Sequence, residues 1–507
     1  MSSFSTQSPV DGGALPSVSA TDPKSLSAML ERARQAQSAW SELPLAARVK
    51  AIGRVKTRVL DRAEALSALI HREVGKPEVE AILGEVLPTA DVIDYWNANL
   101  EEHLEPIEVE IDPIAYPGKS GVIERVARGV VAVIMPWNFP LALPFRALIP
   151  ALLSGNAVLF KPSEVSPRVG AEIVNLFDGL LPDGLLQLVQ GGGDVGAALC
   201  EAGADLVVFT GSVATGRKVA RACAEALIPC ALELGGKDAA IVLKDANLAR
   251  AANGVVWGAM MNTGQNCGAV ERVYVERAIA DEFVKKVVEA AGSLVAGRDF
   301  GPLTTKNQCD IVKRQVDDAV AKGAKVLLGA KAGDDGYQFA MTVIEVDNDD
   351  LPLMADETFG PVLPIAIVAT EEEAIGRANA SRYGLTASIW TKDIKRAQKI
   401  ARKLRAGVIT INNHSFTGAL PGAPWTGVGE SGYGVTNSPF ALDALTRPRF
   451  ILEDRSGAKR ELWWFPYTPA LRAIGLSFAV MRSGSASIFA KVRAVFSLLG
   501  AFVKRWN

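Results

Sequence analysis

Cys267 has the surroundings expected of a reactive thiol. It lies in the segment NTGQNCG (262–268), in which its neighbours are small or polar. Structural cysteines usually lie among aliphatic side chains and are inert. The flanking glycines would let a reacting carbon approach closely. The segment follows a predicted helix over 253–261 and precedes a predicted strand over 272–275, so we expect the thiol in a connecting loop.

A candidate base for this thiol chemistry is Glu233, which lies 34 residues earlier in the segment LELGGK (232–237). A thiol nucleophile needs a base, or a base is needed for the water that later removes the captured group. Partial burial between apolar neighbours would raise the pKa of this carboxyl towards neutrality. The pair alone leaves a second interpretation open, namely a core cysteine and a salt-bridged glutamate.

Composition excludes several classes of protein. The 507 residues are 49% hydrophobic and 22% charged, with a formal net charge of −2, as expected for a globular protein of two or three domains without general affinity for nucleic acid. The five cysteines form no CxxC pair and the three histidines are scattered, so no metal site is predicted. The odd cysteine count is typical of a reducing cytoplasm, and residues 1–24 are interpreted as a polar leader rather than a secretory signal.

Strands and helices alternate through most of the chain, which predicts α/β architecture with a doubly wound parallel sheet. Helices are expected over 22–104, and a second α/β unit from 239 to about 411. A glycine-rich loop over 412–435 is interpreted as a lid or pocket loop. The predicted strands of the first sheet are 130–135, 157–161, 185–189, 205–210 and 229–233.

Two glycine-rich stretches could each bind phosphate. Residues 191–196 fit G-x-G-x-x-G between a strand and a helix, and FTGS (209–212) with Gly216 offers N–H groups and a hydroxyl at a helix N-terminus. Spacing does not decide between them.

Two peripheral segments differ from the rest. An acidic hairpin over 107–126 is interpreted as an arm that packs on another subunit. Residues 456–507 are apolar, aromatic and basic, and a helix is predicted over 488–506. This tail could lie in a membrane interface or pack over a pocket of its own or a neighbouring subunit. Its charge pattern is not one-sided, which favours packing.

Taken together, the motifs resemble those of the NAD(P)-dependent aldehyde dehydrogenases over about residues 25–455. They occur in that family's order, and the spacing of Glu233 and Cys267 is also the family's. The matching motifs are PWNFP (136–140), KPSE (161–164), FTGS (209–212), LELGGK (232–237), GQNC (264–267) and ETFGPV (357–362).

The resemblance implies a catalytic centre of three residues. Cys267 would attack the aldehyde carbon, the amide of Asn138 with the Cys267 N–H would form the oxyanion hole, and Glu233 would activate water to hydrolyse the thioester. The implied cofactor is NAD or NADP, bound by Trp137, Lys161, Glu164, Gly211, Ser212, Glu357 and Phe359.

Within this implied cofactor site, Lys161 and Glu164 would hold the adenosine ribose and Ser212 the pyrophosphate. The other glycine-rich stretch, 191–196, would then not be the phosphate-binding site. Glu357 would hold the nicotinamide ribose, with Phe359 near that ring. The charge of Glu164 would repel a 2′-phosphate, so NAD is preferred over NADP.

The implied organisation has a Rossmann-type dinucleotide-binding domain (25–106 and 127–234), a catalytic domain (235–439) and an oligomerisation arm (107–126 and 440–455), followed by the tail (456–507). A homodimer or homotetramer is expected. One motif departs from the family: where PFGGxKxSGxG is usual, residues 424–432 read PWTGVGESG.

Several functions compete. The apolar tail favours a medium- or long-chain aldehyde over succinate semialdehyde, whose carboxylate would need a cation that the sequence does not identify. An enzyme that passes the thioester to coenzyme A would not need Glu233. A non-catalytic binding protein of this fold would tend to lose the thiol, the base or the amide, and all three are present. A cysteine protease lacks a suitably placed histidine.

Overall fold

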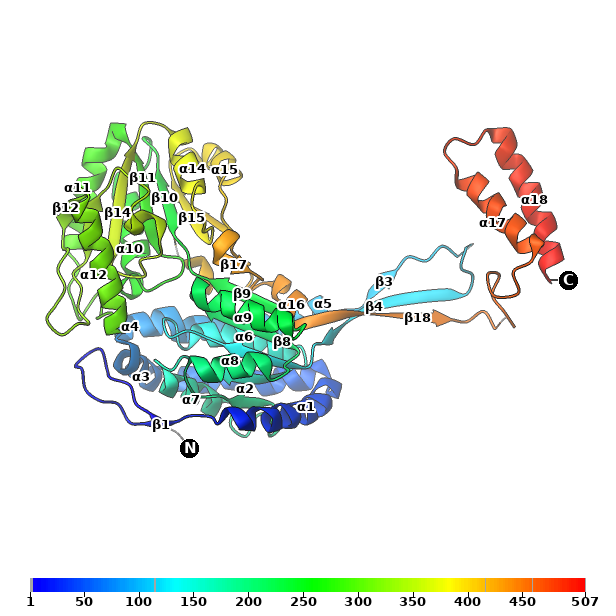
Figure 1. Cartoon of the computed structure of the whole chain (residues 1–507), viewed down its shortest axis with the longest axis horizontal. Helices are drawn as coiled ribbons and strands as arrows, with labels where there is room; N and C mark the ends of the chain where they lie inside the picture. Colours follow the sequence, from blue (N-terminus) through cyan, green and yellow to red (C-terminus); the bar gives the residue numbers. More distant parts are fainter. Residues whose placement is uncertain (1–2, 114, 415, 458, 507) are drawn as a thin grey trace. The chain divides into compact units, whose positions relative to one another are not determined.

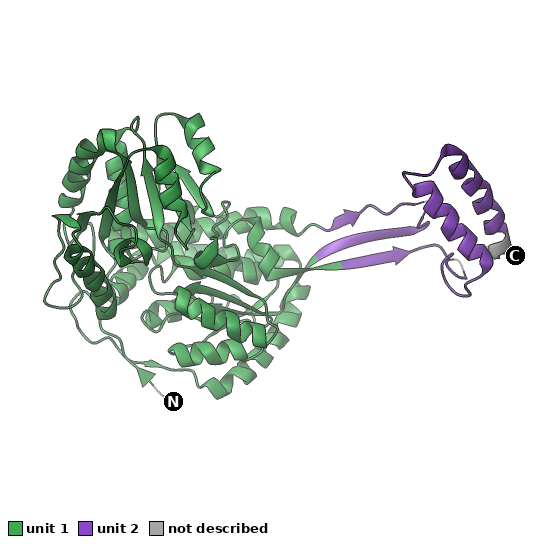
Figure 2. Ribbon diagram, turned by 45° about the horizontal axis from the view of Figure 1, so that its top comes forward, with its two compact units in different colours: residues 1–105, 125–449 green, residues 106–124, 450–507 purple. Residues whose placement is uncertain are grey.

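The computed structural model describes residues 3–113, 115–414, 416–457 and 459–506. The chain divides into two compact units, one made of residues 1–105 and 125–449 and the other of residues 106–124 and 450–507 (Figure 2). The larger unit contains both main sheets, so it contains every candidate site residue.

A mostly parallel sheet forms the first half of the larger unit (Figure 1). Its strand order, β17-β9-β8-β5-β6-β7, confirms the doubly wound parallel sheet, because β5 pairs with the later strand β8 on one side and β6 on the other. The predicted strands agree with the observed ones to within a residue at each end. They are β5 (Val130–Ile134), β6 (Ala157–Lys161), β7 (Leu186–Leu188), β8 (Leu206–Gly211) and β9 (Cys230–Leu234).

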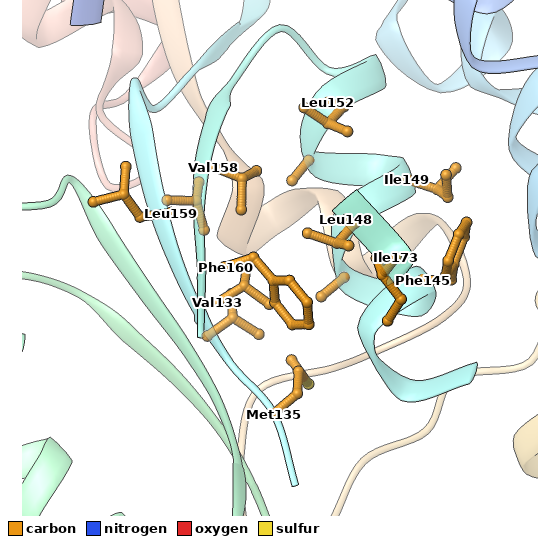
Figure 3. Packing of buried hydrophobic residues seen from close by; sticks show 14 of the residues in the cluster. Val133, Met135, Phe145, Leu148, Ile149, Leu152, Val158, Leu159, Phe160 and Ile173 are labelled. Carbon is orange, nitrogen blue, oxygen red and sulfur yellow. The ribbon is translucent and has the colours of Figure 1, made fainter. Parts of the chain in front are cut away.

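The core of this half lies between the central strands and helix α6 (Ala142–Leu153). All five residues of β5 and of β6 are buried, because both faces of a parallel sheet are covered. Figure 3 shows Val133 and Phe160 of these strands packing towards Phe145 and Leu148 of α6. The other helices around this sheet are α7 (Pro167–Leu176), α8 (Gly193–Glu201) and α9 (Val213–Glu225).

The second sheet has the order β12-β13-β14-β11-β10-β15-β16, parallel except for β12. Its strands are β10 (Asp238–Val242), β11 (Val270–Glu276), β12 (Lys325–Leu328), β13 (Thr342–Glu345), β14 (Val362–Val368), β15 (Thr386–Trp390) and β16 (Val408–Ile411). Its helices are α10 (Leu248–Met260), α11 (Ala280–Gly292), α12 (Lys306–Ala321), α13 (Pro352–Ala355), α14 (Glu371–Asn379) and α15 (Ile394–Ala401).

The predicted loop over 412–435 contains some regular structure. Strand β17 (Gly432–Tyr433) pairs antiparallel with β9, opposite Glu233 and Leu232. Two hydrogen-bonded residues give little periodicity, so the sequence shows only the glycines around them. The short helix α16 (Leu442–Leu445) follows.

Within 22–104, the sequence pattern predicts long helices over 45–71 and 78–104, and the structure divides each of them. The N-terminal helices are therefore shorter than predicted. They are α1 (Leu26–Glu42), α2 (Leu45–Asp61), α3 (Ala63–Val74), α4 (Glu78–Ala81) and α5 (Leu87–Leu104), with a π-helical turn over Ile82–Val86. Gly75 ends α3 in a left-handed conformation, which glycine adopts without steric cost.

A buried ion pair ties these helices to the loop after β5. Lys76 Nζ lies 2.5 Å from Glu85 Oε1, and both side chains are fully buried. Lys76 also donates to the Asn138 carbonyl at 2.9 Å, and Glu85 Oε2 accepts the Leu141 N–H at 2.8 Å. The ammonium and carboxylate therefore satisfy backbone groups within the PWNFP turn and just after it.

The smaller unit contains a three-stranded sheet and two helices. The strands are β18 (Thr446–Asp454), β4 (Lys119–Ala127) and β3 (Ile107–Val109), in that order, and the first two begin or end in the larger unit. Helix α18 (Ile488–Trp506) has its predicted bounds, and α17 (Pro469–Arg482) was not predicted. No helix in the described part of the chain is long and apolar enough to cross a bilayer.

Replacing Glu85 with Gln should destabilise the protein strongly, because the Lys76 ammonium would be left buried without its counter-charge. Breaking such a pair costs about 3–5 kcal/mol of unfolding free energy, and thermal and urea unfolding would measure it. Asp317→Asn is the matched control, since the exposed Lys313–Asp317 pair contributes about 0–1 kcal/mol. Equal losses in the two variants would contradict the assignment.

Candidate active site

One cavity of about 800 Å³ is lined by all ten residues that the sequence nominates. They come from motifs spread over more than two hundred residues of chain. Those residues are Trp137, Asn138, Lys161, Glu164, Gly211, Ser212, Glu233, Cys267, Glu357 and Phe359.

The two sheets supply opposite walls of this cavity. The motif residues of the first sheet stand at or just beyond the carboxyl ends of β5, β6, β8 and β9, where parallel sheets bind ligands. In the second sheet, Cys267 precedes β11 and Phe359 precedes β14, and these two strands are hydrogen-bonded neighbours. The cavity therefore lies between the carboxyl edge of one sheet and the amino edge of the other.

The surroundings of the Cys267 thiol favour its protonated form. Burial raises its pKa well above the ordinary value, and the charge of Glu233 raises it further. Just before it, Asn262 and Thr263 have φ of 54° and 57°, a left-handed conformation uncommon for side chains other than glycine. A strained backbone conformation of this kind persists only where the surrounding contacts hold it in place.

Glu233 is a buried carboxyl with one oxygen held and one available. Its Oε1 accepts a hydrogen bond of 3.0 Å from Trp425 Nε1. Its Oε2 is buried and has no hydrogen-bond partner among the described residues. Burial raises the pKa of Glu233, while the hydrogen bond from Trp425 and the charge of Arg146 oppose that rise. This state suits a group that must take up a proton near neutral pH.

Asn138 is fixed beside the cysteine loop. Its carbonyl oxygen accepts from Asn262 Nδ2 at 2.8 Å as well as from Lys76, and its own Nδ2 donates to the Gln265 carbonyl at 3.2 Å. An amide nitrogen carries two hydrogens. One is used by Gln265, which leaves the second for an oxygen atom in the cavity.

A second buried ion pair shapes the ETFGPV loop. Lys237 Nζ lies 2.5 Å from Glu271 Oε2, and the two Glu271 oxygens accept the N–H groups of Thr358 and Phe359 at 2.7 and 2.8 Å. Glu357 is thereby turned onto the backbone at Gly235. A Cβ at Gly235 would come within 2.2 Å of the Glu357 carboxylate, so a larger residue there would displace that side chain.

The opposite end of the cavity has features that fit a dinucleotide. Ser212 is exposed and caps α9, its Oγ accepting the Thr215 N–H at 3.3 Å, so that the helix N-terminus faces the cavity. Lys161 Nζ lies 3.8 Å from Glu164 Oε2. At the inner end, the rings of Trp137 and Phe359 pack edge to face, with their centroids 5.6 Å apart.

The second glycine-rich stretch also reaches this cavity. Gly193 and Gly196 line it, and a Cβ at Gly196 would lie 3.5 Å from Lys161 Cε. The structure therefore brings both stretches to one site, at the Lys161 end. Among the described residues, no cluster of His, Cys, Asp or Glu side chains is arranged to hold a metal ion.

Two site residues were not found from the sequence. Trp425 replaces the usual phenylalanine of the C-terminal motif, and only its indole N–H explains the contact with Glu233. Arg146 lies on α6, its charge acts on both Cys267 and Glu233, and its Nε is buried without a partner among the described residues. The available signal was that Arg146 is the single charge in the apolar stretch 129–160.

Comparison with known proteins agrees with this geometry. The model of the aldehyde dehydrogenase family matches residues 2–451. This chain belongs to the aldehyde dehydrogenase family. It is an oxidoreductase that uses NAD(P) to oxidise an aldehyde to a carboxylic acid. The predicted family and fold class are therefore confirmed.

Several individual aldehyde dehydrogenases are similar to this chain over most of their length. The 4,4'-diapolycopene aldehyde oxidase of a Methylomonas species is 40% identical, over 92% of this chain and 89% of the relative. A putative NADP-dependent succinate-semialdehyde dehydrogenase of Mycobacterium ulcerans is 34% identical, over 88% and 89%. The structure of PnpE from Pseudomonas sp. WBC-3 in complex with nicotinamide adenine dinucleotide has a TM-score of 0.86 and 32% identity, over 91% and 96%.

Proposed function

We propose that this aldehyde dehydrogenase works by a hydrolytic thioester route in which Cys267, Asn138 and Glu233 are the catalytic residues. The thiol loses its proton to solvent water as its sulfur bonds to the aldehyde carbon. The aldehyde oxygen becomes an alkoxide, held by the Asn138 amide and the Cys267 N–H. A bound NAD(P) supplies the acceptor for the hydride that leaves this carbon. The resulting thioester is hydrolysed by water that loses its proton to Glu233, which frees the acid and the thiol.

The observation that carries this proposal is the shared cavity. Cys267, Glu233 and Asn138 line the same space as Lys161, Glu164 and Ser212. A thiol, a carboxyl with an unpaired oxygen and an amide donor are the three groups that the route requires. The available Glu233 oxygen supports hydrolysis over transfer to coenzyme A, and it also argues against a non-catalytic binding protein.

We further propose NAD as the preferred cofactor, in the domain arrangement 25–106 with 127–234 for the dinucleotide and 235–439 for catalysis. Glu164 supports this preference, since it is half exposed beside Lys161 and its charge would repel a 2′-phosphate. The family resemblance supports a homodimer or homotetramer joined through the arm (107–126 and 440–455), and the odd cysteine count supports a cytoplasmic location.

The substrate class has two candidates. The tail supports an apolar medium- or long-chain aldehyde. Arg146 supports an aldehyde that also carries a carboxylate, because its buried guanidinium has an unpaired Nε near the nucleophile. This is the cation that the sequence alone did not identify for a semialdehyde.

The central test replaces Glu233 with Gln and follows NADH in rapid mixing. We expect one NADH per active site in the first turnover and a steady state slowed about 10²–10⁴-fold, the usual contribution of a general base. Cys267→Ala, as the control, should give neither phase. Loss of the first turnover in Glu233→Gln would instead assign the carboxyl to thiol deprotonation, and an unchanged steady state would contradict the proposal.

Trp425→Phe should shift the pH dependence of turnover. The hydrogen bond from Trp425 lowers the pKa of Glu233, so removing the indole N–H should raise that pKa. Less of the carboxyl is then ionised at a given pH, and the acidic limb of the kcat profile should move to higher pH, with activity recovered at alkaline pH. A uniform loss at every pH would indicate a packing defect rather than a lost hydrogen bond.

Arg146→Met should separate the two substrate classes. If a substrate carboxylate pairs with Arg146, KM for succinate semialdehyde should rise about 10–100-fold, the value of a hydrogen bond to a charged group. KM for nonanal serves as the control and should not rise. Turnover of nonanal by both proteins, with none of the semialdehyde by either, would select the apolar class.

A further inference from the structure

Helix α18 has an exposed apolar face. Seven large apolar side chains recur along it at the spacing of a single helical stripe, and their exposed fractions range from 39% to 84%. They are Ile488, Phe489, Val492, Val495, Phe496, Leu499 and Val503. A continuous apolar stripe of this size on a water-facing helix normally marks an interaction surface.

The opposite side of α18 already has a partner. Ala494 and Ala501 are buried, as are Ile474 and Ser477 of α17, the helix that packs against α18. The two helices run side by side in Figure 1. Small residues thus face α17, while the stripe of large residues points away from it. The stripe is therefore not the hairpin's own interface.

Charge indicates what the stripe would meet. Residues 456–507 contain eight Lys and Arg but a single acid, Glu461, whereas residues 1–455 contain 46 basic and 55 acidic residues. Lys491 and Arg493 lie on either side of the stripe in helical projection. An apolar stripe bordered by basic residues complements an anionic lipid surface, where acyl chains lie directly behind the charged headgroups.

Aromatic residues of the same unit support a lipid partner. Trp463, Phe465 and Tyr467 are exposed just before α17. Amphipathic rings of this kind concentrate at the boundary between lipid headgroups and acyl chains. Since no described helix is apolar enough to cross a bilayer, α18 would lie in the plane of that boundary.

We propose that α18 docks the enzyme onto membranes that contain anionic lipids. The stripe of seven side chains enters the headgroup boundary, and Lys491 and Arg493 contact lipid phosphates. The one-sided stripe reverses the preference for tail packing drawn from charge alone. This proposal does not depend on the catalytic residues, so it stands or fails separately from the proposed function.

Vesicle flotation with the full-length enzyme tests the proposal. We expect the protein to float with vesicles of phosphatidylcholine and phosphatidylglycerol but not with phosphatidylcholine alone, and 0.5 M NaCl should reduce binding because salt screens the basic residues. The double variants Phe489→Asp/Phe496→Asp and Lys491→Glu/Arg493→Glu should each lose at least tenfold in binding. Turnover of a water-soluble aldehyde should be unchanged.

Leu227→Asp is the matched control, since Leu227 is 92% exposed in the larger unit and its loss should leave flotation intact. Absence of flotation by the unmodified enzyme would overturn the proposal, as would binding unaffected by either double variant. If Phe489→Asp/Phe496→Asp instead reduces the oligomer mass in light scattering without altering flotation, the stripe contacts a second copy and the membrane proposal is wrong.

Discussion

The geometry of the site depends on buried ion pairs that hold its loops in place. The Lys76–Glu85 pair is removed from water and would be costly by itself. It is retained because each partner also satisfies backbone groups of the turn that carries Asn138. That turn has no regular hydrogen-bond ladder, so without Glu85 the buried N–H of Leu141 would lose its acceptor. The Asn138 carbonyl would keep only the hydrogen bond from Asn262.

A second buried ion pair holds a loop beside the second sheet. Glu271, paired with Lys237, accepts the N–H groups of Thr358 and Phe359, and so fixes a loop in which Phe359 has a left-handed backbone. Each wall of the cavity thus has one rigid, ion-paired loop. Between them, Cys267 and Glu233 interact closely enough for each to affect the other's pKa.

The sequence predicts the parts of this arrangement that depend on local pattern. Apolar runs located β5 and β6, and short motifs nominated the ten residues that line the cavity. The ion pairs and hydrogen bonds between segments distant in sequence could not be predicted. Glu85 lies in a helical stretch, where charge usually means a solvated face, and Lys76 lies in the short link after α3. Only the packing of α6 against the neighbouring helices shows that both are buried. The hydrogen bond from the Trp425 indole likewise depends on the tertiary fold, which brings the glycine-rich loop 412–435 next to Glu233.

The raised pKa of Cys267 has a consequence for the enzyme at rest. Peroxides and electrophiles react with thiolates far faster than with thiols. Burial and a neighbouring carboxylate disfavour the Cys267 thiolate, and this should slow its oxidation. The environment that makes Cys267 a slow nucleophile thus also protects it from oxidants.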